Sequence, residues 1–534
     1  MKKRFSLATV SVLFVVALFM GVGLNSVVSS DNIFDGLNKI KDVLSLAEKY
    51  YVDEIDTPKL VNAAINGMLS NLDPHSVYIP ASDLPKINEE FQGSFEGIGV
   101  EYDVLNDTLV VVAPVAGGPS EALGIMAGDK ILKINDSTSI GIKRDDVPKK
   151  LRGPKGTHVK VSIYRPGEKD LIDYDITRDK IPLYSVDVSF MVKDDIGYVS
   201  VNRFAGTTHD EFVAALEKLR KQGMKKLILD LRNNPGGYLE QAYKLSDELL
   251  PKGKKVVYTK GRRSEFNEDY TSAGGSYSDV SLIVLVNHGS ASASEIVSGA
   301  IQDWDRGLIV GETTFGKGLV QRQIDLPDKS AFRLTIARYY TPSGRLIQRP
   351  YGTDIDEYRK EGLTKDDVEG ENVEHKEEKD STKPVFKTAS GRTVFGGGGI
   401  TPDYIIKGEK ASALYVQIAS KLAFRNFALQ YVDEHGKQLH AEYEKDIQKY
   451  IRSFNISDEM MASFQSAVKK KGVTVEPAQW EKDVPALKSR IKGEIARTMW
   501  GNEGLWRVFQ HSDDIQFQKA TTLFPEAEKI AGIR

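Results

Sequence analysis

The chain has 534 residues, of which 40% are hydrophobic and 28% are charged, and its net charge is −3. It is too long for one hydrophobic core, so we expect about three or four globular domains. The near-neutral charge and the scattered Lys and Arg residues argue against a nucleic-acid partner. The absence of cysteine excludes disulfides, thiolate metal sites, a cysteine nucleophile and a lipid-bearing cysteine.

The first 30 residues have the pattern of an export signal. Lys2, Lys3 and Arg4 precede residues 7–24, which carry no charged side chain, and a run of serine and valine follows. This apolar run is longer than the ~7–15 residues usual in a signal-peptide core, and its cleavage site is weak. A buried core helix is the alternative, but the stretch has no polar face. We interpret residues 1–30 as a signal peptide or, preferably, an uncleaved membrane anchor that leaves the rest of the chain in the periplasm.

Residues 31–92 are predicted to form an N-terminal helical domain. Apolar side chains recur at helical spacing over residues 40–47 and again over 60–68. The sequence Leu-Asp-Pro-His-Ser at 72–76 interrupts this pattern with a proline turn.

Residues 93–180 are predicted to form a small β domain with two helices. The expected strands are 99–102, 109–112, 130–135 and 158–164, and the expected helices are 120–123 and 145–151. Near the start of this domain, Gly97 and Gly99 flank the bulky residue Ile98. Such a loop can turn backbone N–H groups toward the terminal carboxylate of a peptide, while the adjacent strand edge pairs with the peptide main chain. An ordinary tight turn is the alternative.

The later sequence Ala-Gly-Asp-Lys-Ile-Leu-Lys-Ile-Asn at 127–135 favours peptide binding over a simple turn. With it, the whole region resembles a PDZ domain. The predicted peptide-binding residues are Gly97, Ile98, Gly99 and Val100.

Residues 181–350, completed by 393–408, are predicted to form an α/β core. Continuous apolar strands separated by helices indicate a mostly parallel sheet covered on both faces. The expected strands are 196–201, 227–231, 282–286 and 308–310, and the expected helices are 209–222, 239–250 and 294–304. A hairpin is expected from strands at 319–326 and 331–339.

Two other segments differ in composition from this core. Residues 351–392 are strongly polar and are predicted to be a charged, disordered insertion. Residues 409–534 are predicted to be a C-terminal helical region with Trp480, Trp500 and Trp506 as core anchors. The chain as a whole is therefore predicted to be an α/β multidomain protein.

Ser292 lies between an expected strand and an expected helix, in the sequence Asn-His-Gly-Ser-Ala-Ser-Ala-Ser-Glu at 287–295. A hydroxyl there is at the positive end of a helix dipole, where free N–H groups can stabilise an oxyanion. This placement suits a nucleophile. Ser292 and Glu295 also fit the Ser-x-x-Glu capping box, so a helix cap is the alternative from this segment alone.

Lys317 favours the nucleophile, because it lies between two glycines 25 positions after Ser292 and can serve as its general base. A solvated loop lysine is the alternative. A lysine acts as a base only when it is deprotonated. Lowering its pKa from about 10.4 to about 7 takes ~4–5 kcal/mol of desolvation, which a buried site can supply. Gln321, on the strand that follows, can hold the amine through its side-chain carbonyl.

The sequence Asp-Leu-Arg-Asn-Asn-Pro-Gly-Gly at 230–237 also follows a buried strand and begins a helix. Its Pro-Gly-Gly turn exposes backbone amides, one of which can complete an oxyanion hole with the N–H of Ala293. A phosphate cradle is the competing use, but neither glycine fingerprint of a nucleotide site is present. His75, His209 and His288 are the candidates for a histidine base, and no metal-ligand motif occurs.

Together these motifs resemble the C-terminal processing peptidases, or tail-specific proteases, of the serine/lysine type. The resemblance covers residues 35–350, with six motifs in order at 72–76, 97–100, 230–237, 290–295, 315–321 and 340–345. It implies a ClpP/crotonase-like protease core with an inserted PDZ domain.

The resemblance also implies roles for single residues. Ser292 is the nucleophile, Lys317 the general base and Gln321 the residue that orients the lysine. The implied oxyanion donors are Ala293, Gly236 and Gly237. Arg152 matches a segment implicated in the switching of the active site by the PDZ domain.

We therefore expect an exported serine endopeptidase that captures the C-terminal tails of protein substrates through its PDZ domain. The alternatives are a catalytically inactive PDZ protein that only binds peptides, and a crotonase-like hydrolase of acyl esters or thioesters. Further expected partners are other copies of the chain, an adaptor protein, and the membrane through an uncleaved N-terminal segment. No cofactor or metal is expected.

Overall fold

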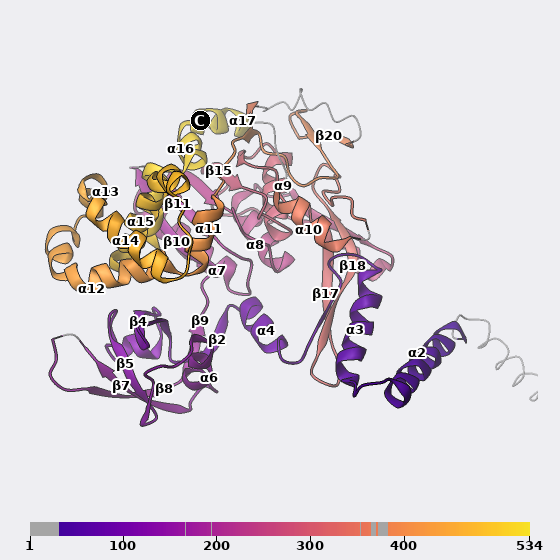
Figure 1. Ribbon diagram of the computed structural model, residues 1–534. Helices are drawn as coiled ribbons and strands as arrows, with labels where there is room; N and C mark the ends of the chain where they lie inside the picture. Colours follow the sequence, from indigo (N-terminus) through magenta and orange to yellow (C-terminus); the bar gives the residue numbers. More distant parts are fainter. Residues whose placement is uncertain are drawn as a thin grey trace, which may run out of the picture. The chain divides into compact units, whose positions relative to one another are not determined.

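The computed structural model describes residues 31–165, 167–193, 195–352, 354–364, 370–371, 383–408 and 410–533 (Figure 1). It divides into two compact units, Met1–Tyr78 and Ile79–Arg534, and each is described by itself. The predicted export signal at 1–30 lies outside the described residues. Across those ranges, no helix has the length and apolar character needed to cross a membrane.

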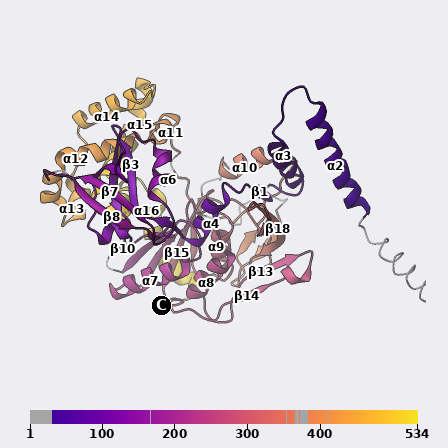
Figure 2. The same cartoon turned by 90° about the horizontal axis from the view of Figure 1, so that it is seen from below.

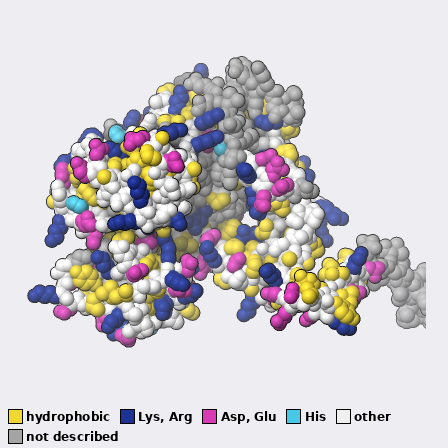
Figure 3. Space-filling view, viewed as in Figure 1, with side chains coloured by type: hydrophobic (Ala, Val, Ile, Leu, Met, Phe, Trp, Pro, Cys, Tyr) yellow, Lys and Arg dark blue, Asp and Glu magenta, His cyan; other side chains and the backbone are white. Residues whose placement is uncertain are grey.

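The first unit contains the helices α2 (Asp31–Tyr50) and α3 (Thr57–Ser70). The Asp56 side chain caps α3 by accepting a hydrogen bond from Lys59 N at 3.0 Å. Apolar side chains are exposed along α2, as Figure 3 shows. After α3, one oxygen of Asp73 accepts the N–H groups of His75 and Ser76 at 2.8 Å, which closes the predicted proline turn.

The second unit begins with α4 (Leu84–Gln92) and then enters the predicted PDZ region. Its antiparallel sheet has the order β3 (Val100–Leu105), β4 (Thr108–Pro114), β5 (Lys130–Ile134), β7 (His158–Tyr164) and β8 (Ile172–Thr177), with β6 (Ser137–Thr138) beside β5. The short helices α5 (Pro119–Ala122) and α6 (Val147–Leu151) complete it. The strands β2 (Ser94–Gly97) and β9 (Asp179–Pro182) pair with each other at the two ends of this region. Since β3 is the last strand of its sheet, one of its edges is left without a partner strand in the described chain.

A second, largely parallel sheet forms the centre of the unit. Its order is β10 (Val186–Lys193), β11 (Ile196–Val201), β12 (Lys226–Asp230), β15 (Ser281–Val286), β16 (Leu308–Gly311), β22 (Tyr404–Ile405) and β19 (Gly370–Glu371). The strands from β11 to β22 are parallel, whereas β10 and β19 run antiparallel to their neighbours. Every residue of β11 and β15 is buried, as their continuous apolar sequences predict.

Alternate residues of these strands enter two hydrophobic cores, one on each face of the sheet. One face is covered by α7 (Thr208–Lys221), α8 (Leu239–Leu249) and α9 (Ala293–Asp303), which lie next to one another in Figures 1 and 2. The other face carries Ile228, Ile283 and Leu285 and is covered by α16 (Ile515–Thr522) and α17 (Phe524–Ala531). The end of the chain therefore completes the core of the central sheet.

A third sheet lies beside α9. It contains the strands β17 (Leu319–Asp325), β18 (Ala331–Tyr340), β13 (Lys255–Gly261) and β14 (Asp269–Thr271), all paired antiparallel. The predicted hairpin is confirmed as β17 and β18, and Leu326 N donates to Ser330 O at 2.8 Å to close its turn.

The prediction of a disordered insertion at 351–392 is wrong for its described parts. Residues Ile355–Thr364 form α10, and β20 (Val385–Lys387) pairs with β21 (Thr393–Phe395). Tyr358 of α10 is buried, and its ring makes an edge contact with Phe315. One buried aromatic residue thus orders a helix whose composition is otherwise polar, which a compositional argument overlooks. Residues 365–369 and 372–382 lie outside the described chain.

The C-terminal region is helical, as predicted. Its helices α11 (Ala413–Ser420), α12 (Ala423–Tyr443), α13 (Ile447–Ser453), α14 (Asp458–Lys470) and α15 (Pro477–Ser512) enclose a separate core. Trp480 is buried in this core and Trp500 packs against it. Trp506 instead packs against the second core of the central sheet, where the centres of the Trp506 and Tyr198 rings lie 6.1 Å apart. All three predicted tryptophan anchors are confirmed.

Candidate active site

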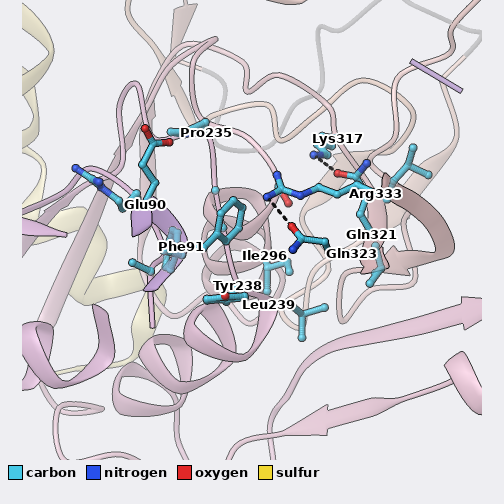
Figure 4. A pocket seen from close by; sticks show the side chains of 18 of the residues that line it. Glu90, Phe91, Pro235, Tyr238, Leu239, Ile296, Lys317, Gln321, Gln323 and Arg333 are labelled. Carbon is cyan, nitrogen blue, oxygen red and sulfur yellow. Dashed lines mark hydrogen bonds between the residues drawn. The ribbon is translucent and has the colours of Figure 1, made fainter. Parts of the chain in front are cut away.

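A cleft of about 890 Å³ lies beside the carboxyl ends of the central strands. It is lined by residues from α4, the turn before α8, the start of α9, and the strands β17 and β18. Figure 4 shows Phe91, Tyr238 and Ile296 along it, with Lys317 and Gln321 at one end. Of the predicted site residues, the cleft brings together Ser292, Lys317, Gln321, Gly236 and Gly237.

Ser292 lies in a strained backbone conformation at the start of α9. Its φ is +55° and its ψ −110°, a region that residues with a side chain rarely adopt, and such strain concentrates at functional sites. The loop that carries it is fixed by hydrogen bonds to the neighbouring strand end. Ser290 Oγ donates to Leu231 O at 2.8 Å, and Ala291 N donates to Asn234 O at 3.0 Å. Ser292 is therefore held at the carboxyl ends of the central strands.

The Glu295 carboxylate connects the Ser292 loop to the Lys317 loop. Its Oε2 accepts the N–H groups of both Ser292, at 2.8 Å, and Lys317, at 2.9 Å. Its Oε1 accepts from Thr314 Oγ1 at 2.6 Å and Gly316 N at 2.7 Å. Burial raises the pKa of Glu295, while these four donors act in the opposite direction. Sequence reasoning identified only the contact within the helix cap.

The Tyr339 hydroxyl connects the same two loops through their carbonyl groups. It lies 3.0 Å from Ser292 O and 2.5 Å from Lys317 O, so its proton can be donated to either. Burial raises the pKa of Tyr339 well above the ordinary value, which keeps the phenol protonated. In the sequence this residue is only one aromatic position of a strand, although it directly precedes the motif at 340–345.

Lys317 is half-buried, and its Nζ donates to Gln321 Oε1 at 2.8 Å (Figure 4). The two glycines that flank it are needed for close packing. A Cβ on Gly318 would lie 2.8 Å from Gln348 N, and Gly316 has a φ of +88°. The glycines therefore allow the backbone on both sides of Lys317 to pack closely against neighbouring segments.

The Pro-Gly-Gly turn packs closely against the loop that carries Ser292. A Cβ on Gly236 would lie 2.7 Å from Ser292 Cβ, and one on Gly237 would lie 2.1 Å from Phe204 O. The Gly236 N–H donates to Asn234 Oδ1 at 2.9 Å within the turn, and its role as an oxyanion donor stays a prediction. Ala293 is the first residue of α9, where an N–H has no partner within the helix. Gly237 and Ala293 are the other two predicted donors.

Among the described residues, the lining of the cleft includes no histidine. The Nδ1 atom of His288 lies 2.7 Å from Thr313 O, and Nε2 of His209 lies 3.1 Å from a carboxylate oxygen of Glu248. Neither residue lines the cleft. Among the residues that the structure describes, no cluster of His, Asp and Glu side chains could hold a metal ion.

The predicted peptide-binding loop, Gly97–Ile98–Gly99–Val100, connects β2 to the edge strand β3. Ile98 is buried in the core of this domain, and Gly99 has a φ of +72°. Their carbonyl groups are fixed, because Ser120 Oγ donates to Ile98 O at 2.6 Å and Val115 N donates to Gly99 O at 2.9 Å. The loop is therefore a rigid turn at one end of the open edge of β3.

Arg152 follows α6 directly and contacts α4. Its Nη1 lies 2.6 Å from Glu89 Oε2, and its guanidinium carbon lies 4.2 Å from the centre of the Phe95 ring. Other residues of α4, including Phe91, line the cleft. Arg152 thus forms a direct contact between the predicted PDZ domain and a wall of the cleft.

Comparison with known proteins assigns families to four segments. Residues 195–358 match the peptidase family S41, 97–176 a PDZ domain, 23–82 the N-terminal domain of the activating protease CtpB, and 414–501 a family of unknown function.

Two curated relatives are similar over most of these segments. A "Carboxy-terminal-processing protease" of Bartonella bacilliformis is 38% identical over 348 residues, which cover 63% of this chain and 80% of the relative. A "Probable CtpA-like serine protease" of Staphylococcus aureus strain COL is 36% identical over 345 residues, which cover 64% of this chain and 69% of the relative.

Among solved structures, a photosystem II D1 C-terminal processing protease is 29% identical with a TM-score of 0.33, over 63% of this chain and 98% of that one. The matches of the S41 and PDZ segments, and the identity over 80% of a carboxy-terminal-processing protease, agree with a cleft that holds both Ser292 and Lys317. The chain therefore belongs to the carboxy-terminal processing peptidases of family S41 and is a serine protease with a PDZ domain.

Proposed function

We propose that this protein cleaves other proteins close to their C-terminal tails, with Ser292 as nucleophile and Lys317 as general base. One observation carries the proposal. The backbone N–H groups of Ser292 and Lys317, 25 positions apart in the sequence, are both bound to the same oxygen of Glu295, and both residues line one cleft. A buried carboxylate that fixes both loops supports the constant geometry that a nucleophile and its base require.

In the first step, the neutral amine of Lys317 takes the proton of the Ser292 hydroxyl while Oγ attacks the peptide carbonyl. Gln321 accepts a hydrogen bond from Nζ, which a neutral amine can still donate, and so holds the amine in one rotamer. The N–H groups of Gly237 and Ala293 stabilise the oxyanion. Lys317 then passes its proton to the leaving amine, and water hydrolyses the acyl-enzyme by the same route in reverse.

Substrate capture is assigned to the PDZ domain. An extended tail adds to the open edge of β3, and the loop of Gly97 to Val100 receives its terminal carboxylate through backbone N–H groups. The ion pair of Arg152 with Glu89 connects this domain to α4, so tail binding can change the wall of the cleft. We also infer that the core is of the ClpP/crotonase kind, and that homo-oligomers or an adaptor protein contribute to substrate delivery.

The proposal also includes the cellular location. The basic and apolar pattern of residues 1–30 supports export to the periplasm and retention at the inner membrane as an uncleaved anchor. N-terminal sequencing of protein from membrane and soluble fractions tests this. A mature chain that begins near residue 31 in the soluble fraction would contradict the anchor.

The catalytic pair is tested with an unfolded reporter protein that ends in an apolar tail. Ser292→Ala and Lys317→Ala are each expected to abolish cleavage while tail binding to the PDZ domain persists. Lys329→Ala, which changes an exposed lysine in the turn of the β17–β18 hairpin, is the matched control and should cleave normally. Normal turnover by Lys317→Ala would show that the base is a different group. A thioester substrate hydrolysed faster than any peptide would favour the crotonase-like alternative.

A further inference from the structure

A cationic side chain reaches into the cleft from β18. Arg333 lines the same cleft as Ser292 and Lys317, and Figure 4 shows its side chain extending across it. Its guanidinium carbon lies 4.3 Å from the centre of the Phe91 ring. Its Nη2 donates to Gln323 Oε1 at 3.4 Å, and Gln323 in turn donates to Asn88 Oδ1 at 3.2 Å. The guanidinium is thus held by a ring and one amide.

Arg333 has no carboxylate partner among the described residues, although it is half-buried. Two arginines that are more deeply buried than Arg333 do have one, whereas the buried Arg178 and Arg306 instead donate to several backbone carbonyls. Arg345 Nη2 lies 2.6 Å from Asp303 Oδ1, and Arg232 Nη2 lies 2.6 Å from Asp230 Oδ2. Burial lowers the pKa of Arg333, and the nearby charge of the exposed Glu90 opposes this shift only in part. An unpaired, partly desolvated guanidinium is costly unless a bound molecule supplies the anion.

The side chains that line the cleft also carry an excess of positive charge. Arg203 and Arg333 line it, besides Lys317, which acts as a neutral amine in the proposed mechanism, whereas Glu90 is its one acidic residue in the described chain, and that side chain is exposed. A bound peptide with a carboxylate near Arg333 would restore the balance. The planar guanidinium fork matches a carboxylate with two parallel hydrogen bonds.

We propose that Arg333 is a specificity-determining residue that pairs with a carboxylate of the peptide lying in the cleft. This inference rests on the proposed function of Ser292 and Lys317. The carboxylate has two sources: an Asp or Glu side chain beside the cleaved bond, or the terminal carboxylate of a chain that ends within the cleft. Both present the same group to the same guanidinium, and both would favour acidic over amide substrates.

The experiment uses the full-length enzyme and two sets of fluorogenic peptides that share one apolar tail. In the first set, Asp and Glu replace Asn and Gln at each position within three residues of the cleaved bond. In the second set, peptides that end close to the cleaved bond carry either a free or an amidated terminus. We expect wild type to prefer the carboxylate in at least one set by about tenfold in kcat/KM, which corresponds to ~1.4 kcal/mol.

Variants then assign this preference to Arg333. Arg333→Gln should remove it while cleavage of the neutral peptides persists, which also shows that the variant is folded. Arg333→Lys should retain part of it, and Arg333→Glu should favour a lysine peptide at the same position. Arg338→Gln, an exposed position on the same strand, is the matched control and should behave as wild type.

Two outcomes overturn the inference: no preference for carboxylate over amide in either set, or a preference that Arg333→Gln leaves unchanged. Neither bears on the catalytic pair, which is checked separately by Ser292→Ala. If Ser292→Ala still cleaved the neutral peptides, the proposed function would fail instead.

Discussion

At the scale of single residues, a buried carboxylate connects the two loops of the candidate site. Glu295 accepts four hydrogen bonds, two on each oxygen, and one oxygen serves the N–H groups of both Ser292 and Lys317. Tyr339 contacts the carbonyl groups of the same two residues. The relative position of the proposed nucleophile and base is therefore fixed through their backbones rather than through the hydroxyl or the amine.

Glu295→Gln tests this positioning role. The glutamine retains one acceptor oxygen, but its NH₂ group faces N–H donors, and each buried donor left unsatisfied costs about 1–3 kcal/mol. We expect kcat to fall by about 100-fold with little change in KM, because a displacement of the two loops of about 1 Å has effects of that order. Peptidase kinetics measure both constants.

Glu240→Gln is the control for this change, since Glu240 is an exposed carboxylate at the start of α8. It should leave both constants unchanged. A folded Glu295→Gln enzyme with kcat within about twofold of wild type would show that the carboxylate is merely a helix cap.

At the scale of elements, the site is assembled from turns at the ends of parallel strands. The loop after β12 carries the Pro-Gly-Gly turn, the loop after β15 carries Ser292, and the loop after β16 carries Lys317. Because these strands are neighbours in the sheet, their carboxyl ends meet at one edge. The turns then pack so closely that Gly236 has no room for a side chain beside Ser292.

Gly236→Ala tests that close packing. The new Cβ would lie 2.7 Å from both Ser292 Cβ and Ala291 O, and the position has a φ of +96°. We expect the Ser292 loop to move and activity to be lost. Gly253→Ala is the control, because its φ is +82° but no atom lies within 4 Å of the new Cβ. It should cost about 1 kcal/mol of stability and no activity. Equal activity losses in both variants would show that backbone strain, rather than the clash with Ser292, is responsible.

At the scale of the whole molecule, the C-terminal region contacts both the protease core and the PDZ domain within the second unit. Its last helices, α16 and α17, cover one face of the central sheet. Arg425 of α12 and Arg497 of α15 lie 3.3 Å and 3.2 Å from Glu101 on β3. The segment that matches a family of unknown function therefore includes the residues that contact the PDZ sheet.

Phe524→Ala tests the packing of α17 on the central sheet. Phe524 is 2% exposed, and truncation of a buried aromatic side chain costs about 3–5 kcal/mol. We expect a lower midpoint for the thermal transition of the core, followed by calorimetry, and a loss of activity in proportion to the unfolded fraction. Ile515→Ala, at a position that is 41% exposed on α16, should change little. An unchanged transition in Phe524→Ala would show that the sheet is stable without this cover.

Glu101→Lys tests the contact between the C-terminal region and the PDZ domain. The substitution places a cation beside the guanidinium groups of Arg425 and Arg497. Val110 and Val112 of the adjacent strand β4 are also buried, although they do not belong to the hydrophobic core of the PDZ domain. We expect faster amide hydrogen exchange in β3, β4 and α12, measured by mass spectrometry. Asp170→Lys, on an exposed loop of the same domain, should leave exchange in these elements as in wild type. Unchanged protection in Glu101→Lys would show that apolar contacts alone hold the two parts together.

Local patterns in the sequence were sufficient for much of this fold. The strand predicted at 158–164 is β7 and that at 196–201 is β11, because continuous apolar or alternating side chains mark strands without reference to the rest of the chain. The same reasoning found Ser292, Lys317 and Gln321, because residues at the ends of neighbouring parallel strands must meet. The contact of Lys317 Nζ with Gln321 follows from their short separation along the chain.

Only the tertiary structure decides the contacts between segments that are distant in sequence and share no periodicity. The bridge from Glu295 to Lys317 exists because β15 and β16 pair in one register, and that register is set by side-chain packing across the sheet. The cover of the central sheet by α17 likewise depends on which apolar faces meet in the folded chain. Sequence alone therefore determined the secondary structure and the type of chemistry, whereas the geometry of the site, and the unpaired charge of Arg333 in its cleft, arise from packing, which depends on the whole chain at once.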